Sequence, residues 1–167
     1  MPTREDFINF HCPRYEEFPS LELYAEQVIS LVREYLSIFS DGTPLLTSNM
    51  INNYVKQKIV KPPVNKKYDR VHLSYFVAVC LMKGFMNISE LCSGFELLLG
   101  KYTVKDVYNI FCDELESALR CAFIGTPFRP ISKDDSDEIV IIRSMCTSFA
   151  NLTLVHFMIE EKQASKS

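Results

Sequence analysis

The chain has 167 residues, with 18 Lys or Arg against 21 Asp or Glu and no Trp. This length suits one domain, or a small module with an extension, and the charged fraction of 23% argues against disorder along the whole chain. A net charge of −3 argues against a strongly basic protein that coats nucleic acid. The five glycines have no spacing typical of a dinucleotide- or phosphate-binding loop.

The charge is unevenly distributed along the chain. Residues 1–43 contain 3 basic and 8 acidic residues, residues 44–105 contain 9 and 3, and residues 106–167 contain 6 and 10. A basic middle section therefore lies between two acidic flanks, which the small net charge of the whole chain conceals.

The N-terminus and the cysteines bear on the compartment. No apolar run follows the first residues, as a signal peptide requires, and the longest apolar run, Tyr75–Met82, is far shorter than the roughly 20 residues of a membrane span. The six cysteines form no C-x-x-C pair, so we expect them to be reduced and mostly buried, with no zinc site. We expect a cytoplasmic protein with no membrane segment.

The first half of the chain contains two predicted helices and a turn. Apolar residues at spacings of three and four predict a helix over Ser20–Phe39, capped by Ser20, and the preceding segment His11–Pro19 is expected to lie extended over the surface. A short helix over Thr47–Lys58 follows, capped by Thr47 or Ser48. Because Pro62 and Pro63 exclude helix, Lys61–Tyr68 is predicted to be a turn or a short two-stranded ribbon.

Four further helices are predicted in the second half. They are expected over Asp69–Lys83 with Gly84 just beyond its end, from Asn87 to about Leu99 with a capping box, from Thr103 to Gly125, and from about Asp137 to Glu161. In the last of these helices, six residues follow a heptad-like spacing, which is typical either of packing inside the monomer or of pairing with a second chain. This seam comprises Ile142, Met145, Phe149, Leu152, His156 and Ile159. The tail from 162 to 167 is expected to be disordered.

The strongest functional signal lies between Lys56 and Arg70, where fifteen residues carry six basic side chains and one acid. These cations flank a short helix rich in Asn and Ser and continue into the Pro-containing ribbon. Asn can pair with adenine in the major groove, and Lys or Arg can bind phosphates. The pattern is typical of a winged helix-turn-helix, although a solvated basic loop would have the same composition.

The order of these residues resembles the DNA-binding head of MerR-type regulators over about residues 44–95. The matching residues are Thr47-Ser48-Asn49-Met50-Ile51-Asn52-Asn53-Tyr54-Val55-Lys56, Ile59-Val60-Lys61-Pro62-Pro63, Lys67-Tyr68-Asp69-Arg70-Val71-His72-Leu73, Gly84-Phe85 and Ile88-Ser89-Glu90-Leu91. A wider pattern, including Cys12-Pro13-Arg14-Tyr15-Glu16-Glu17-Phe18-Pro19, resembles a bacterial family of unknown function that is thought to be MerR-like.

The MerR resemblance implies roles for individual residues. It makes Ile51 and Tyr54 the inward anchors of the recognition helix. It also implies a DNA-facing set, which together with the basic cluster gives the candidate DNA-binding residues Thr47, Ser48, Asn49, Asn52, Asn53, Lys56, Lys58, Lys61, Lys66, Lys67, Tyr68 and Arg70. Asn52 stands where the family usually has Arg, and Lys58 where a helix-ending Gly is common.

The resulting prediction is an all-α protein with a small β-ribbon, built as a MerR-like winged helix-turn-helix bundle with a C-terminal helical extension. Its expected parts are an extended segment (1–19), the helix-turn-helix unit (20–100), a helical core or dimerisation part (101–161) and the tail. The expected function is a transcriptional regulator that binds double-stranded DNA as a homodimer. The alternative is a protein-interaction or small-ligand module of the same fold that has lost DNA binding.

No enzyme, cofactor or metal site is predicted. Only His11, His72 and His156 could serve as a histidine acid or base, and they lie far apart in the sequence. The acidic run Asp134–Glu138 precedes a predicted helix, where carboxylates interact favourably with the helix dipole.

Overall fold

The computed structural model describes residues 1–166 and is mostly helical, with seven α-helices and one two-stranded antiparallel sheet in that range. The predicted class, helical with a small ribbon, is confirmed. The chain forms two compact units. Unit 2 comprises residues 13–109, and unit 1 comprises residues 1–12 together with the chain from 110 onward.

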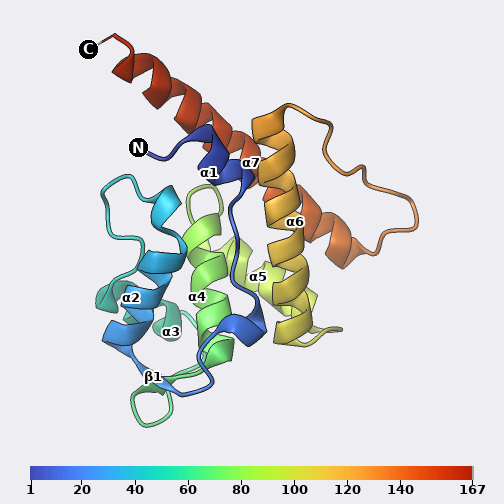
Figure 1. Ribbon diagram of the computed structural model, residues 1–167. Coiled ribbons are helices and arrows are strands. Elements are labelled where there is room, and N and C mark those ends of the chain that lie inside the picture. Colours follow the sequence, from blue (N-terminus) through green and yellow to red (C-terminus); the bar gives the residue numbers. More distant parts are fainter. Residues whose placement is uncertain (167) are drawn as a thin grey trace. The chain divides into compact units, whose positions relative to one another are not determined.

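Unit 2 contains most of the secondary-structure elements (Figure 1). In chain order these are a 3-10 turn at Tyr15–Glu17, β1 (Leu23–Tyr24), α2 (Ala25–Tyr35), a 3-10 turn at Ser37–Phe39, α3 (Ser48–Lys56), β2 (Lys67–Tyr68), α4 (Arg70–Met82), α5 (Ile88–Leu99) and the start of α6 (Val104–Ile124). Helix α2 packs against α3 and α4, and Val28 and Val32 of α2 are fully buried.

Strand β1 replaces the first turn of the predicted Ser20–Phe39 helix. Leu23 pairs with Tyr68, and Tyr24 pairs with Lys67. These pairings hold residues 23 and 24 extended, so the helix begins at Ala25 and the prediction of Ser20 as its cap is wrong. The helix also ends earlier than predicted, at Tyr35, and one 3-10 turn follows it.

The segment before β1 is more deeply packed than the sequence predicted. Pro13 is buried, and the side chain of Phe18 is 1% exposed. The hydroxyl of Tyr108 donates to the carbonyl oxygen of Pro13 at 2.9 Å, and the ring of Phe18 lies 5.4 Å from that of Tyr108. The expectation that this segment runs over the surface is therefore wrong, because its apolar residues belong to the core of unit 2.

Local capping determines where several helices of unit 2 begin. Thr47 accepts from the backbone N–H of Met50 at the start of α3, as one of the two predicted caps. Asp69 caps α4. At α5, Asn87 and Glu90 form the predicted capping box with distances of 2.8 and 3.0 Å. Gly84 lies just beyond α4, directly after the C-cap Lys83, as predicted, but its backbone is not left-handed.

Unit 1 contains α1 (Arg4–Ile8), the larger part of α6 and α7 (Asp137–Ala164). Phe7 stacks on Phe123 with ring centroids 4.5 Å apart, and both rings meet Phe157 edge-on. The guanidinium of Arg4 donates to the carbonyl oxygen of Phe123. The extreme N-terminus thus packs with the C-terminal helices, a pairing that no local sequence pattern indicates.

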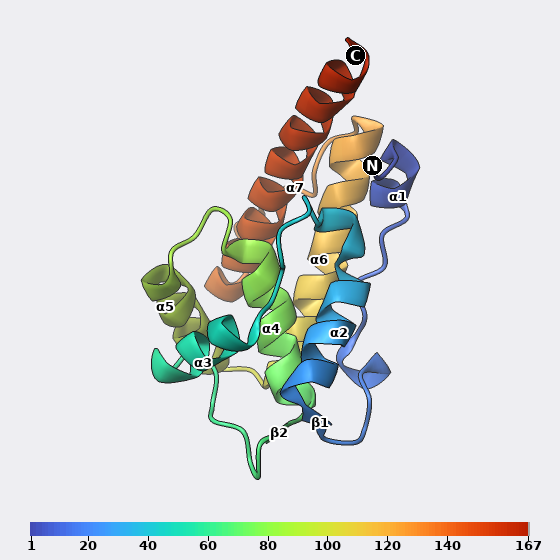
Figure 2. The ribbon, with the colours of Figure 1, turned by 90° about the vertical axis from the view of Figure 1, so that its left-hand side faces the viewer.

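Helix α7 extends beyond α1 and α6 at its C-terminal end (Figure 2). Ile142 and Phe149 of the predicted seam are buried, whereas His156 and Ile159 are exposed. The helix continues through Ala164, so the predicted disordered tail is wrong for residues 162–164, and Ser167 lies outside the described residues.

By length and composition alone α7 could also span a membrane: its most apolar 18-residue stretch has a mean hydropathy of 1.4 and is 28% buried. Core helices of soluble proteins pass the same test.

Candidate nucleic-acid interface

Helix α3 presents a polar surface on one side and anchors on the other. Ile51 and Tyr54 are 1% and 4% exposed, as expected for inward anchors. Burial raises the pKa of Tyr54 to about 12. The residues predicted to face DNA along this helix are exposed: Ser48, Asn49, Asn52, Asn53 and Lys56. The amide of Asn53 is partly engaged, because its oxygen accepts from Gln57 at 2.9 Å.

Helix α3 ends with Lys58 in the left-handed conformation, at φ 61°. The N–H of Lys58 donates to the carbonyl of Val55 at 3.0 Å, and the N–H of Ile59 donates to that of Tyr54 at 3.0 Å. These two bonds form a Schellman motif, in which the left-handed position is usually Gly. The helix therefore closes as it would with Gly, but with a lysine in the strained position.

The ribbon after α3 turns through two further left-handed residues. Val64 and Lys67 exchange backbone hydrogen bonds of 3.1 and 2.9 Å, and between them Asn65 and Lys66 have φ of 50° and 61°. Two consecutive residues with positive φ make this a hairpin turn of type I′, which favours Asn followed by Gly. Lys66 occupies the position where Gly is preferred. The ribbon projects beyond the helices of unit 2 at the lower edge of Figure 1.

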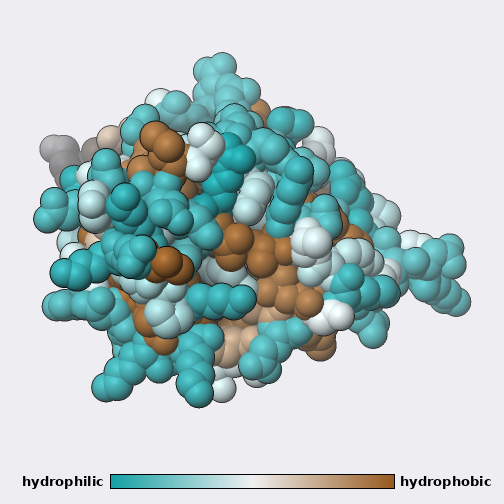
Figure 3. Space-filling view, turned by 90° about the horizontal axis from the view of Figure 1, so that it is seen from below, coloured by the Kyte–Doolittle hydropathy of each residue, from teal (hydrophilic) through white to brown (hydrophobic). Residues whose placement is uncertain are grey.

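Four lysines of the candidate interface carry uncompensated charge. Lys56, Lys58, Lys61 and Lys66 are exposed, and among residues 1–166 no ion pair involves them. The ammonium of Lys67 lies 5.4 Å from the ring centre of Tyr24. Hydrophilic side chains project around apolar patches on the face seen from below (Figure 3).

Three of the predicted DNA-binding residues have structural roles. Tyr68 is 5% exposed, and burial raises the pKa of its phenol. Arg70 donates to the carbonyl oxygens of Phe18 at 3.0 Å and Glu16 at 3.2 Å. Thr47 caps α3. We therefore leave Tyr68 and Arg70 out of the contact surface: the first is covered, and the second fastens the N-terminal segment of unit 2.

A buried histidine connects the two ends of the ribbon. Nδ1 of His72 lies 2.7 Å from Oδ1 of Asp69, and Nε2 lies 3.2 Å from the carbonyl oxygen of Lys61. Burial raises the pKa of Asp69, but the backbone and side-chain hydrogen bonds from His72 outweigh it, so the net pKa is lowered. The sequence did not single out this contact, because the partners of His72 are three and eleven positions away.

The sequence-based prediction also did not include two residues that shape or contact the ribbon. Asn65 forms half of the turn, and an Asn in a short segment between two extended runs was a signal that could have identified it. Tyr24 contacts Lys67 from β1, and that contact depends on strand pairing between distant parts of the chain.

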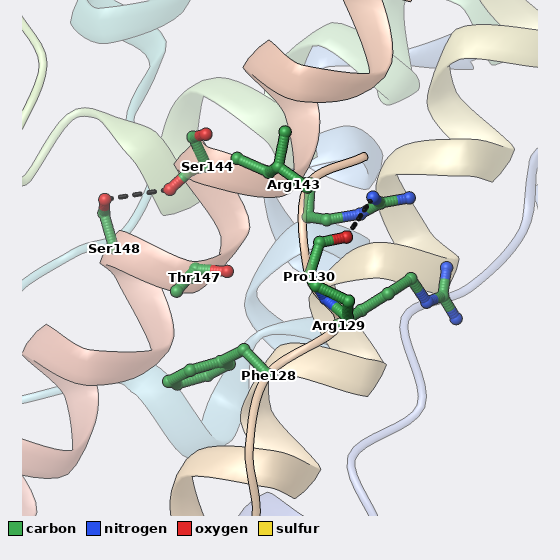
Figure 4. Close-up of a pocket in the computed structure, with 8 residues that line it drawn as sticks. Phe128, Arg129, Pro130, Arg143, Ser144, Thr147 and Ser148 are labelled. Carbon is green, nitrogen blue, oxygen red and sulfur yellow. Dashed lines mark hydrogen bonds between the residues drawn. The ribbon is translucent and has the colours of Figure 1, made fainter. Parts of the chain in front are cut away.

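Unit 1 contains a cavity of about 410 Å³ between the segment 128–131 and α7 (Figure 4). Its lining residues are Phe128, Arg129, Pro130, Ile131, Arg143, Ser144, Thr147 and Ser148. Phe128 lies below Thr147, whereas the two guanidinium groups extend to the other side of the segment (Figure 4).

The guanidinium groups of Arg129 and Arg143 are held by the buried carboxylate of Glu114. Arg143 donates to both carboxylate oxygens of Glu114 at 3.2 Å, and to the carbonyl of Pro130 and to Asp135 at 2.9 and 2.7 Å. Arg129 donates to Glu114 at 2.7 Å. Donation to the Glu114 carboxylate raises the pKa of Arg143. This network fixes the cavity wall, and it leaves only part of the Arg129 guanidinium for a ligand.

The structure shows no grouping of three or more His, Cys, Asp or Glu that could bind a metal within the part of the chain it describes. The histidines are dispersed: His11 pairs with Glu116 at 3.2 Å, His72 lies at the ribbon, and His156 is exposed on α7. None of the six cysteines, all within the described residues, forms a disulfide.

Comparison with family models gives one assignment. Residues 13–111 match the model of a family described as a domain of unknown function (DUF1836), and this region is more than half of the chain. The chain belongs to this family. The matched region covers all of unit 2, including α3, the ribbon and α4, so the family domain and the compact unit coincide. Neither curated proteins nor solved structures give a match.

Proposed function

We propose that this DUF1836 protein is a transcriptional regulator that binds double-stranded DNA with the exposed face of α3 and the ribbon. The observation that carries the proposal is the position of the strained residues. Within residues 1–166 the non-glycine residues with positive φ are Lys58, Asn65 and Lys66, and all three lie in the candidate interface. Left-handed backbone costs a residue with a side chain about 1–2 kcal/mol, which Gly would avoid.

Strain of this kind, when surrounding structure maintains it, often marks a functional site. Here lysine occupies two positions at which Gly would suit the fold better, and both lysines are exposed. Their backbone conformation lowers stability, while their ammonium groups add charge to an already basic surface. Phosphate binding would account for positive charge gained at the expense of stability, because each neutralised phosphate releases counterions and contributes to affinity.

The polar face of α3 would supply base contacts. Asn49 and Asn52 are exposed amides, and Asn pairs with two atoms of adenine in the major groove. Ser48, Asn53 and Lys56 extend the same face. Lys61, Lys66 and Lys67 would bind the backbone beside the groove, as wing residues do.

We also propose a MerR-like winged helix-turn-helix as the closest description of unit 2. Its support is the order α2, α3, ribbon, α4 and the outward polar face of α3. One feature departs from that plan: residues 36–47 connect α2 and α3, whereas a helix-turn-helix turn has about three or four residues. Gly42, at φ 93°, lies in this longer connection.

The decisive experiment replaces the two strained lysines by Gly. The Lys58→Gly, Lys66→Gly variant keeps or improves the backbone conformation and removes two charges. We expect weaker binding to genomic DNA fragments in fluorescence anisotropy and a fall of up to about 1.8 in the slope of log K against log salt, from about 0.9 per phosphate contact. A Lys66→Glu, Lys67→Glu variant should weaken binding further.

Lys133→Gly, an exposed lysine in unit 1, is the control for the change in net charge. Affinity and slope equal to those of the parent in the double Gly variant would contradict the proposal. A folded protein that binds no DNA at low salt would contradict it as well.

The same function implies a homodimer, and α7 is the proposed pairing element. Val155 and Ile159 are 52% and 50% exposed near its C-terminal end, and Leu152 is half-buried on the same side of the helix. A Leu152→Lys, Val155→Lys variant should be monomeric by light scattering where the parent is dimeric. A parent protein that is monomeric would contradict the proposed dimer. If that monomer floated with lipid vesicles, α7 would contact a membrane instead.

The alternative is a small-ligand or protein-interaction module, and the cavity in unit 1 is the observation that favours it. The cavity has apolar walls at Phe128 and Ile131 and hydroxyl groups on α7. It lies outside the family-matched region. A co-purified ligand together with no DNA binding would support this reading.

A further inference from the structure

His72 is enclosed by oxygen atoms. It lies in the first turn of α4, is 7% exposed, and meets the ring of Tyr68 edge-on at 5.3 Å. Nδ1 lies 2.7 Å from the carboxylate oxygen Oδ1 of Asp69. Nε2 lies 3.2 Å from the carbonyl oxygen of Lys61 and 3.4 Å from that of Pro62. Both ring nitrogens therefore face oxygen acceptors, and Nδ1 also lies 3.1 Å from the backbone N–H of Asp69.

A neutral imidazole has only one N–H, so it can serve only one of these two sides. With the proton on Nδ1, the lone pair of Nε2 faces the two carbonyl oxygens. With the proton on Nε2, Nδ1 can accept from the backbone N–H of Asp69 at 3.1 Å, but its lone pair then faces the carboxylate at 2.7 Å. Only the doubly protonated ring donates to Asp69 and to Lys61 together.

The two sides are the two ends of the ribbon. Lys61 and Pro62 begin it, whereas Asp69 follows β2 and caps α4 by accepting from the N–H of His72 at 3.1 Å. The turn with Lys66 lies between them. We propose that His72 is a proton-operated latch: the charged ring ties the base of the ribbon to α4, and loss of one proton releases one side.

The groups around the ring determine the direction of the effect. Asp69, the cap of α4, is the charged group that faces it, Tyr68 from β2 approaches with its ring, and Lys61 and Pro62 from the ribbon approach with carbonyl oxygens. These oxygens are all hydrogen-bond acceptors, so only the doubly protonated ring can donate to both sides. The latch is therefore closed at low pH and opens as pH rises through the range in which histidines lose their proton. The latch stands without DNA binding, whereas its effect on DNA affinity rests on the function proposed above.

The test follows ring charge and ribbon opening in the same sample. Long-range ¹H–¹⁵N NMR of the full chain reports the protonation of each histidine ring between pH 5 and 9. Hydrogen exchange, corrected for the intrinsic effect of pH, reports opening at Val64 and Lys67. We expect these amides to exchange about tenfold faster when the ring is neutral, since a hydrogen bond to a charged group is lost.

Two variants and a control separate the latch from general instability. Asp69→Asn keeps a capping oxygen but removes the carboxylate that faces Nδ1, so ribbon exchange at low pH should be faster than in the parent. His72→Gln should make ribbon exchange independent of pH, and His156→Gln, on the exposed part of α7, should leave it unchanged. Ribbon exchange that does not follow the charge of His72 in the parent, or a neutral ring under a protected ribbon across the range, would overturn the latch. If His72→Gln does not fold, the parent and Asp69→Asn decide the question.

Discussion

Glu114 and Arg143 form a buried ion pair in unit 1, with the carboxylate oxygens 3.2 Å from two guanidinium nitrogens. The two residues are 5% and 9% exposed. Arg143 also donates to the carbonyl of Pro130, and Arg129 donates to the same carboxylate. One acid on α6 thus holds α7 and the connection between them.

We expect Glu114→Ala to destabilise unit 1 by about 3–5 kcal/mol, because it leaves the Arg143 guanidinium buried without its main partner. Urea denaturation followed by circular dichroism gives the free energy of unfolding. The control is Lys133→Ala, which truncates an exposed side chain of unit 1 and should change stability little. Equal, small losses in both variants would show that the buried network does not hold the helices.

The strain at Lys58 leads to a prediction about stability alone. Lys58→Gly relieves a left-handed lysine at φ 61°, so the free energy of unfolding should rise by about 0.5–1 kcal/mol. Lys56→Gly is the matched control, because Lys56 is the last helical residue of α3 and Gly there should lower stability by about 0.5–1 kcal/mol. Thermal and urea denaturation of the three proteins test the sign, and a loss of stability in Lys58→Gly would show that lysine is not strained there.

Local sequence was sufficient to predict most helix boundaries and the polar face of α3. Thr47, Asn87 and the Pro62-Pro63 step act over a few residues, so their effects could be read directly. On α6, Tyr108 and Leu115 are 3% and 0% exposed, as the spacing of seven residues between them on one helix face would predict. Helix α1 was missed, although Thr3 and Asp6 form a capping box that the sequence displays.

The remaining differences come from contacts between distant residues. β1 exists because Leu23 meets Tyr68, and no pattern near Leu23 specifies that partner. The role of Arg70 follows from the position of the Glu16–Phe18 backbone. On α7, Ile142 and Ile159 shared a predicted seam but differ in burial, because the C-terminal end of the helix extends beyond α1 and α6 (Figure 2).

Glu16 should contribute to the acid sensitivity of unit 2. Its hydrogen bonds with Lys105, at 2.6 Å, and with Asn109, at 3.1 Å, lower the pKa of its carboxyl from 4.5 to about 2. A lowered pKa in the folded state means that the ionised carboxylate stabilises the fold above about pH 4.5, and that this contribution is lost as pH falls toward 2. The stability difference between the parent and Glu16→Gln should therefore be largest above pH 4.5 and fade toward pH 2.

Urea denaturation at a series of acidic pH values measures that difference. The exposed Glu22→Gln serves as the control and should show no such trend. A difference between Glu16→Gln and the parent that stays constant with pH would mean that the carboxylate has no special partner in solution. Because Glu16 and Lys105 are half-exposed, the trend should weaken in high salt.

Tyr108 anchors the first segment of the family domain, and its hydroxyl can be removed with little change in shape. The Tyr108 hydroxyl donates to the carbonyl of Pro13 at 2.9 Å inside the core. Tyr108→Phe leaves that carbonyl without this donor, so the free energy of unfolding should fall by about 1–2 kcal/mol. The segment 13–18 should also open more often, and trypsin should cleave after Arg14 faster than in the parent. Tyr102→Phe, a partly exposed tyrosine before α6, is the matched control and should change neither quantity. Unchanged stability together with unchanged cleavage in Tyr108→Phe would show that ring packing against Phe18, not the hydrogen bond, holds this segment in place.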